Sequence, residues 1–277
     1  MPGTLYVVAT PIGNLGDLSP RAAEVLRTVD AVAAEDTRRT RKLYAHLGAT
    51  PPSLVSLPAF GERERLGPIV DRLRAGESVA LCTDAGTPGI SDPGQALVAA
   101  AWEAGARVVP VPGPVAAVAA LAASGLASDR FFFAGFLPRK GGARADALRL
   151  LARVPATTVL YEAGNRTHET LRDLARALGD RPAAVARELT KLHEEIARGR
   201  LSELAERFAG EVLGEVTVVV GGAPGDMPED EAAEPLEDEL RRRTAAGEAP
   251  SAIAREVARA RGLKRAEVYA VLEKLKR

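Results

Sequence analysis

The stretch TDAGTPGISDPG, from Thr83 to Gly94, decides the fold of the first half of this chain. It follows a short apolar run, 79–82, which is typical of a buried strand. Three glycines and two prolines after a strand end predict a compact turn with unusual backbone angles. In an open α/β sheet, ligands bind beyond the carboxyl ends of the strands, so this turn is a candidate binding wall.

Two further turns follow strand-like runs in the same way. Pro11–Asp17 comes after an expected strand at Thr4–Ala9, and Pro112–Pro114 comes after one at Arg107–Val111. We expect the three turns to gather at one edge of the first sheet and to hold a ligand by loop backbone and apolar walls. Such a crevice suits a neutral or zwitterionic cofactor with an adenine and an amino-acid end, because nothing in it demands a polyphosphate.

Strand-like and helix-like segments alternate along the chain, which favours the α/β class. Adjacent strands without an intervening helix, around 187–199, indicate a mixed sheet in the second half. We therefore predict a two-domain α/β fold, with a parallel-rich sheet domain over 1–124 and a mixed-sheet domain over 125–225.

The last part of the chain has a different pattern. An acidic linker is expected at 226–236, followed by a helical segment at 237–277 with three short helical patterns. Ser251 is expected to cap the second helix and Gly262 to end it. The spacing fits a helix-turn-helix, and it fits equally a three-helix packing without nucleic-acid contact.

Composition excludes several classes of protein. The 277 residues are 46% hydrophobic and 27% charged, with a net charge of zero, so the chain does not coat nucleic acid by bulk charge. One cysteine and three histidines without zinc spacing predict no metal site. No run has the length of a membrane span, and we expect a cytoplasmic protein with no membrane partner. Neither a phosphate-loop string nor a GxGxxG or GxSxG motif follows a strand, which disfavours kinases, dinucleotide enzymes and hydrolases.

Several strings are similar to those of a known family. They are VATPIGNLGD at 8–17, EDTRRT at 35–40, TDAGTPGISDPG at 83–94, PVPGP at 110–114, YEAGNRTHETL at 161–171 and RELTKLHEE at 187–195. Over nearly the whole chain they resemble the tetrapyrrole methylase superfamily. The EDTRRT and TDAGTPGISDPG strings resemble in particular its branch of methyltransferases that act on a cytidine ribose 2′-hydroxyl in small-subunit (16S) ribosomal RNA.

The resemblance implies two α/β domains with S-adenosylmethionine in the cleft between them, a homodimer, and small-subunit ribosomal RNA or the 30S subunit as partner. The cofactor-binding residues that it implies are Pro11, Thr87, Pro88, Gly89, Ile90, Pro114, Val115, Tyr161 and Leu189. One departure stands out. Gly164-Asn165 replaces the Pro-His pair usual in the branch, which excludes a histidine role there and predicts a more flexible loop.

A ribose hydroxyl is a weak nucleophile, so the reaction needs a group that takes its proton as the methyl group arrives. The candidate catalytic residues are Glu35, Asp36, Asp84, Glu188 and Lys191. Asp36 is equally well explained as the cap of the following helix. Arg187 and Glu188 are also consistent with a plain salt bridge, and His193 is a weaker candidate in a charged, exposed context.

Contact with RNA requires positive charge. The candidate RNA-binding residues are Arg38, Arg39, Arg41 and Lys42 on one helix, Arg139 and Lys140 on one loop, and Lys264 and Arg265 near the last helix. Arg144 is expected on the same loop as Arg139, and each cluster taken singly is also explained as a solvated surface. Two other functions stay open: a tetrapyrrole-ring methylase, which would need a large open pocket without basic helices, and a nucleic-acid-binding regulator acting through the last three helices.

Overall fold

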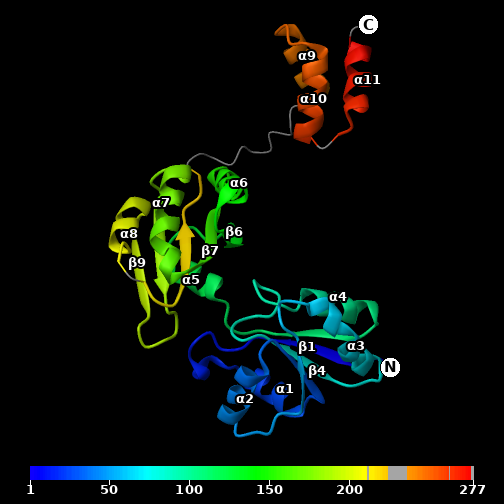
Figure 1. Cartoon of the computed structure of the whole chain (residues 1–277), viewed down its shortest axis with the longest axis vertical. Helices are drawn as coiled ribbons and strands as arrows, with labels where there is room; N and C mark the ends of the chain where they lie inside the picture. The colour runs from blue at the N-terminus through cyan, green and yellow to red at the C-terminus, as the bar shows by residue number, and fades with distance from the viewer. Residues whose placement is uncertain (211, 224–235, 262, 276–277) are drawn as a thin grey trace. The chain divides into compact units, whose positions relative to one another are not determined.

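A computed structural model describes residues 1–210, 212–223, 236–261 and 263–275. The chain divides into two compact units, Met1–Ala223 and Pro224–Arg277. The first unit contains two five-stranded sheets (Figure 1).

The first sheet is wholly parallel, with strand order β3-β2-β4-β1-β5. Its strands are β1 (Thr4–Val8), β2 (Ala31–Ala34), β3 (Ser53–Ser56), β4 (Val79–Cys82) and β5 (Arg107–Val111). Its α-helices are α1 (Pro20–Thr28), α2 (Thr37–His46), α3 (Leu66–Arg74) and α4 (Gln95–Glu103). Two short 3-10 helices, η1 (Leu15–Asp17) and η2 (Glu62–Arg65), lie in its loops. Every residue of β2 and β4 is buried, as expected for parallel strands covered on both faces. Because the strands are parallel, the loops that follow them lie at one edge.

The sequence patterns above did not include α3 and α4. The α4 sequence, QALVAAAWE, is apolar over most of its length and so lacks the polar face that marks a surface helix.

The second sheet is mixed, as predicted, with strand order β6-β7-β10-β8-β9. Only β6 and β7 run parallel to each other, and the other neighbours are antiparallel. Its strands are β6 (Phe131–Phe136), β7 (Thr157–Ala163), β8 (Pro182–Arg187), β9 (Glu195–Arg200) and β10 (Glu215–Val220). Its α-helices are α5 (Ala116–Ser124), α6 (Gly141–Ala152), α7 (Thr167–Leu178) and α8 (Leu201–Arg207), and a short 3-10 helix, η3 (Gly164–Arg166), follows β7.

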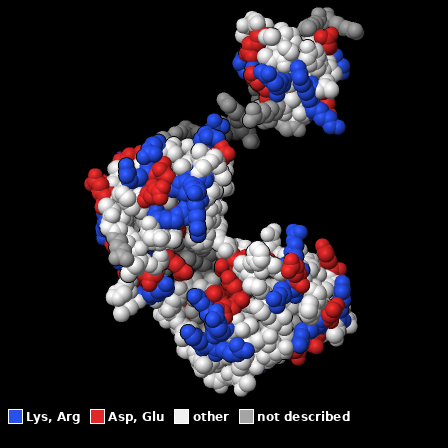
Figure 2. Space-filling model, viewed as in Figure 1, with Lys and Arg blue, Asp and Glu red and all other residues white. Residues whose placement is uncertain are grey.

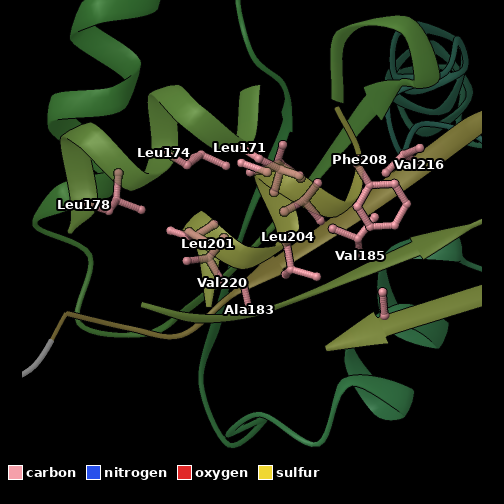
Figure 3. Close-up of a cluster of buried hydrophobic side chains, with 14 of the residues drawn as sticks. Leu171, Leu174, Leu178, Ala183, Val185, Leu201, Leu204, Phe208, Val216 and Val220 are labelled. Atoms are coloured by element: carbon pink, nitrogen blue, oxygen red, sulfur yellow. The ribbon is translucent and has the colours of Figure 1, made fainter. Parts of the chain in front are cut away.

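Alternating side chains of this second sheet pack against helices on its two faces. Val218 and Val220 of β10 join the core under α7 and α8. Figure 3 shows Val220 in this core with Leu171, Leu174 and Leu204. Val219, between them, packs instead in the cluster that includes Leu121 and its neighbours on α5. The period of two along the strand thus buries both faces of the sheet.

The second unit consists of α9 (Leu236–Ala245), α10 (Pro250–Arg261) and α11 (Arg265–Leu275), packed around Leu240, Ile253, Val257, Val268 and Leu272. Ser251 does not cap α10, because that helix already begins at Pro250, a residue well suited to a first turn.

The acidic linker predicted at 226–236 lies outside the described residues except for Leu236, which begins α9. Gly262, the predicted helix end, lies outside them too. Within the described ranges, no helix is long and apolar enough to cross a membrane.

Candidate functional site

A cavity of about 410 Å³ in the first unit is lined by residues of both sheets. On one side lie the loops after β1, β2, β4 and β5, joined to each other by short contacts. Thr10 and Gly86 exchange backbone hydrogen bonds of 2.8 and 3.0 Å, and the Thr87 hydroxyl donates to the carbonyl oxygen of Pro114 at 3.2 Å. The three turns predicted to gather at one edge therefore do so.

The cavity wall contains strained backbone. In the described part of the chain, three non-glycine residues have a positive φ: Ser91 at 63°, Glu188 at 50° and Thr190 at 67°. Ser91 and Glu188 line the cavity, and Thr190 lies between the lining residues Leu189 and Lys191. Backbone in the left-handed region costs of order 1–3 kcal/mol per residue and collects at functional sites. The strain thus supports the cavity as the functional site.

Acidic side chains dominate the charged groups of the cavity. Six carboxylates line it, against the two cations Arg39 and Lys191, and in Figure 2 a red group of acidic side chains lies in the hollow beside α2. The six are Glu35, Asp84, Asp92, Glu162, Glu188 and Glu215. Burial raises the pKa of Asp84, although Arg39, with its Nε 3.3 Å from Asp84 Oδ2, acts in the opposite direction.

Asp92 differs from its neighbours because its half-buried carboxylate has no hydrogen-bond or ion-pair partner among the described residues. Burial, reinforced by the negative charges of Glu35, Asp84 and Glu215, raises its pKa to about 6. A carboxylate in this position is costly to ionise unless a cation comes to it. The cavity is therefore suited to a ligand that carries positive charge.

Glu188 and Lys191 form an ion pair, with Lys191 Nζ 2.9 Å from Glu188 Oε1 and 3.6 Å from Glu215 Oε2. This pairing lowers the pKa of Glu188 and raises the pKa of Lys191, so both groups are charged at neutral pH. Gly214 makes room for it, because a Cβ there would lie 2.0 Å from Glu188 Oε1. The suggested Arg187–Glu188 salt bridge is wrong, since Arg187 pairs with Glu195 at 3.0 Å across the β8–β9 ladder.

The second sheet contributes an aromatic wall. The Tyr161 ring lies 5.0 Å from that of Phe133 and 5.6 Å from that of Phe136, between ring centroids. The Tyr161 hydroxyl accepts a hydrogen bond from the backbone N–H of Ala117 at 3.2 Å. Tyr161 and Phe136 line the cavity together with Val115 and Ala116 at the start of α5.

The structure brings together most of the residues predicted for the site. Of the expected cofactor contacts, Thr87, Ile90, Val115, Tyr161 and Leu189 line the cavity, whereas Pro11, Pro88, Gly89 and Pro114 lie in the same loops outside its lining. Of the catalytic candidates, Glu35, Asp84, Glu188 and Lys191 line it. Their roles stay predictions.

Asp36 is the exception among the catalytic candidates, because it is the N-cap of α2. Its carboxylate accepts from the backbone N–H of Arg38 at 2.8 Å and pairs with the guanidinium of the same residue at 2.7 Å. These bonds lower its pKa to about 2. The capping alternative therefore describes this residue.

Most of the basic residues predicted to touch RNA lie exposed where expected. Arg38, Arg39, Arg41 and Lys42 lie on α2, where basic side chains gather in Figure 2, while Arg139 and Lys140 follow β6 and Lys264 and Arg265 stand at the start of α11 in the second unit. His193 is also exposed, as expected.

Arg144 is not on the loop with Arg139. It is a buried residue of α6, and its Nε bonds Asp173 Oδ2 at 2.9 Å while Nη1 donates to the carbonyl oxygen of Pro138 at 3.1 Å. This arginine fixes the loop from inside, because a buried cation needs such partners.

Gly164-Asn165 is packed rather than loose. Gly164 begins η3, its N–H donates to the carbonyl oxygen of Gly214 at 2.9 Å, and a Cβ at this position would lie 2.3 Å from the carbonyl oxygen of Val212. The expectation of a more flexible loop there is not supported, because this close approach requires glycine.

Several cavity residues escaped the sequence prediction: Ile12, Asp92, Phe136, Glu162 and Glu215. Asp92 lies within the Thr83–Gly94 turn, and this position in the sequence was the signal that could have identified it as a site residue. Ile12 lies in the Pro11–Asp17 turn, which was expected at the same edge, but the residue itself was not named as a contact. Phe136, Glu162 and Glu215 come from strands of the second sheet, and no local pattern marked them as neighbours of the turn.

The family comparison agrees with this geometry. Residues 4–205 match the family model for tetrapyrrole (corrin/porphyrin) methylases, so the chain belongs to this methyltransferase family. It is 48% identical over 270 residues to "Ribosomal RNA small subunit methyltransferase I" of Synechocystis sp., covering 96% of each chain. It is 54% identical over 226 residues to the protein of the same name from Xylella fastidiosa, covering 80% of this chain and 82% of that one.

Solved structures share the fold. The uroporphyrin-III C-methyl transferase of Thermus thermophilus, in its complex with S-adenyl homocysteine, has a TM-score of 0.57 at 24% identity and covers 79% of this chain and 97% of that one. A diphthine synthase has a TM-score of 0.60 at 19% identity, covering 79% of this chain and 90% of that one. At these identities the likeness shows the two-sheet fold alone, and it confirms the fold class predicted from the sequence.

Proposed function

We propose that this protein uses S-adenosylmethionine to methylate a cytidine ribose 2′-hydroxyl in small-subunit ribosomal RNA. Family membership and the names of relatives at about half identity support the reaction class and the RNA. The observation that carries the cofactor assignment is the acidic cavity, in which Asp92 has no partner from the described residues.

The residues of the cavity fit this cofactor. When bound, S-adenosylmethionine supplies an electrophilic methyl group on a sulfonium, and its amino-acid end carries an ammonium as well. The volume of about 410 Å³ lies within the range of small-ligand sites, about 300–1,000 Å³. Asp92 and its acidic neighbours stabilise the positive charge, and the aromatic wall at Tyr161 provides an apolar face for an adenine ring.

Among the catalytic candidates, we propose Asp84 as the proton acceptor. In the transfer the ribose oxygen forms the new bond to the methyl carbon, the sulfur–methyl bond breaks, and the hydroxyl proton passes to the base. The raised pKa of Asp84 makes it a stronger base than Asp36 or Glu188, whose pKa values are lowered. Lys191 is held as a cation by Glu188, so it contributes charge rather than proton acceptance.

We further propose that the enzyme acts as a homodimer and that it works in the cytoplasm beside the ribosome. The exposed cations of α2 and of the loop at Arg139 are proposed to contact RNA phosphates. Basic side chains hold and orient an RNA backbone without selecting its sequence. Arg41 and Lys42 have no ion-pair partner among the described residues, which leaves both free to bind phosphate.

The first test is calorimetric titration with S-adenosylmethionine. The wild type should bind with micromolar affinity, and Ile90→Arg should abolish binding because it places a long cation in the cavity wall. Glu64→Arg, at an exposed position outside the cavity lining, is the control and should bind normally. A wild type that binds no cofactor contradicts the assignment.

The acceptor is tested by transfer of tritiated methyl groups to 30S subunits that lack the modification. Ribose methylation protects one phosphodiester from alkaline hydrolysis, which maps the nucleotide. Label on a base, or transfer to uroporphyrinogen instead of RNA, contradicts the proposal.

A further inference from the structure

Phe60 has an aromatic ring that the fold leaves in solvent. Its relative exposure is 97%, in the segment that joins β3 to η2. Scattered apolar side chains on a surface are ordinary, so exposure alone assigns no role. Phe60 combines this exposure with a position next to the cavity.

The segment around Phe60 is fixed at both sides, and each fixed point adjoins the cavity. Before it, the fully buried Leu57 donates its N–H to the carbonyl oxygen of Ala34 at 2.8 Å, next to the lining residue Glu35. After it, Glu62 Oε1 accepts from the backbone N–H of Gly94 at 3.1 Å, two residues beyond Asp92. Phe60 is therefore held at the carboxyl-terminal edge of the first sheet, beside the cavity.

The charges around Phe60 favour an anionic partner. Arg63 and Arg65 are exposed and form no ion pair within the described residues, and α2 carries further cations beside β3. The Glu62 carboxylate is committed to the first turn of α4, where it also accepts from Leu97 N at 3.2 Å. The exposed Glu64 is the opposing charge in this segment.

We propose that Phe60 is a stacking platform for an unpaired base of the RNA substrate, next to the nucleotide that enters the cavity. This inference rests on the proposed function. Proteins that read single-stranded RNA stack splayed bases on exposed aromatic rings while basic side chains hold the phosphates. The segment around Phe60 offers both features: an exposed ring at the cavity edge, and the guanidinium groups of Arg63 and Arg65, which form no ion pair with any described residue.

The test compares three variants in methyl transfer to unmodified 30S subunits. Phe60→Ala should raise KM for the subunit about tenfold, as expected for loss of one stacked base, and leave the affinity for S-adenosylmethionine unchanged. Phe60→Tyr keeps an aromatic face and should retain wild-type KM. Trp102→Ala is the matched control, because Trp102 is 63% exposed but lies at the end of α4, at the opposite edge of the sheet.

A direct reporter is available because Trp102 is the single tryptophan of the chain. Phe60→Trp in a Trp102→Phe background should show fluorescence quenching when 30S subunits are added. Wild-type KM in Phe60→Ala, or an equal effect of Trp102→Ala, overturns the inference while the proposed function stands. Loss of cofactor affinity in Phe60→Ala also overturns it, since the role is then structural. A wild type that methylates no subunit removes the proposed function, and this inference with it.

Discussion

Asp92 and Glu162 are carboxylates of the same cavity wall, and the fold treats them in opposite ways. Asp92 is half-buried, without a hydrogen-bond or ion-pair partner in the ranges that the structure describes, and its pKa is raised to about 6. The Glu162 side chain is fully buried, with Oε2 accepting from the Thr170 hydroxyl at 2.7 Å and Oε1 lying 3.3 Å from Arg166 Nη1. A second guanidinium, that of Arg144, donates to Thr170 Oγ1 at 3.1 Å and extends the network.

The difference indicates that Glu162 contributes to the stability of the fold, whereas Asp92 contributes to ligand binding. A buried carboxylate with all its acceptors used holds the wall in place, because removing it leaves several donors unsatisfied. A carboxylate without partners destabilises the fold and is useful only when a cation arrives. We therefore expect substitutions at the two positions to affect different measurements.

The largest effect is expected from Glu162→Leu, which would leave the Arg166 charge and the Thr170 hydroxyl without their partner. The free energy of unfolding should fall by about 3 kcal/mol, measured by urea denaturation. Glu169→Leu, at an exposed position on α7, is the matched control and should stay within about 0.5 kcal/mol of wild type. Equal losses of stability in the two variants would contradict the stabilising role of the Glu162 network.

Gly214→Ala tests the crowded side of the cavity. The residue has φ 84°, and a Cβ would lie 2.0 Å from Glu188 Oε1, so the Glu188–Lys191 pair must move. We expect a loss of about 2 kcal/mol in stability together with weaker cofactor binding. Gly210→Ala, where a Cβ would meet no atom of the described residues within 4 Å apart from the chain neighbours, should change neither. Normal cofactor affinity in Gly214→Ala would show that the ion pair does not shape the site.

Asp92→Asn tests the pH dependence of stability that an unpaired, half-buried carboxylate should cause. A carboxyl whose pKa is raised in the folded state binds its proton more tightly there than in the unfolded chain. The wild type should therefore lose stability as pH rises from 3.8, the ordinary pKa of an aspartate, to about 6, the pKa of Asp92 in the folded protein. After allowance for solvent screening the change is about 1 kcal/mol. The difference in unfolding free energy between wild type and Asp92→Asn, followed from pH 4 to 7, should show it.

The same variant should bind S-adenosylmethionine about tenfold more weakly at pH 7.5, because the cation loses a negative partner. A flat stability difference across this pH range would show that Asp92 has a partner that the structure does not contain.

The smallest effect is expected at Thr190, whose buried Oγ1 has no hydrogen-bond partner in the described part of the chain. Thr190→Val removes the hydroxyl and keeps the branched shape, so the left-handed backbone at φ 67° is equally strained. Stability should rise by about 0.5 kcal/mol, measured as a shift in the urea midpoint. A loss of more than about 1 kcal/mol would mean that the hydroxyl is bonded in solution.

Much of the fold was predictable because its signals are local. The apolar run before Thr83 and the glycines and prolines after it mark a strand and its turn within a few residues. The mixed second sheet was predictable from the missing helix between β8 and β9. The α4 helix was missed because its sequence is apolar on nearly every side.

The candidate site was predictable only in part. Thr87, Ile90 and Val115 follow directly from strand-end turns, and all three line the cavity. Asp36 was assigned to two roles because local sequence does not distinguish a helix cap from a catalytic carboxylate. Arg144 was misplaced because its partners, Asp173 and Thr170, lie far along the chain.

The α/β alternation, the strand-end turns and the family follow from the amino-acid sequence, because each depends on runs of neighbouring residues. The tertiary structure alone decided which charges are paired. Lys191 is held by Glu188 and Glu215, Glu162 is enclosed, and Asp92 has no partner among the residues that the structure describes. Pairing depends on distances between segments that the chain brings together from both sheets, and local patterns contain no record of those distances.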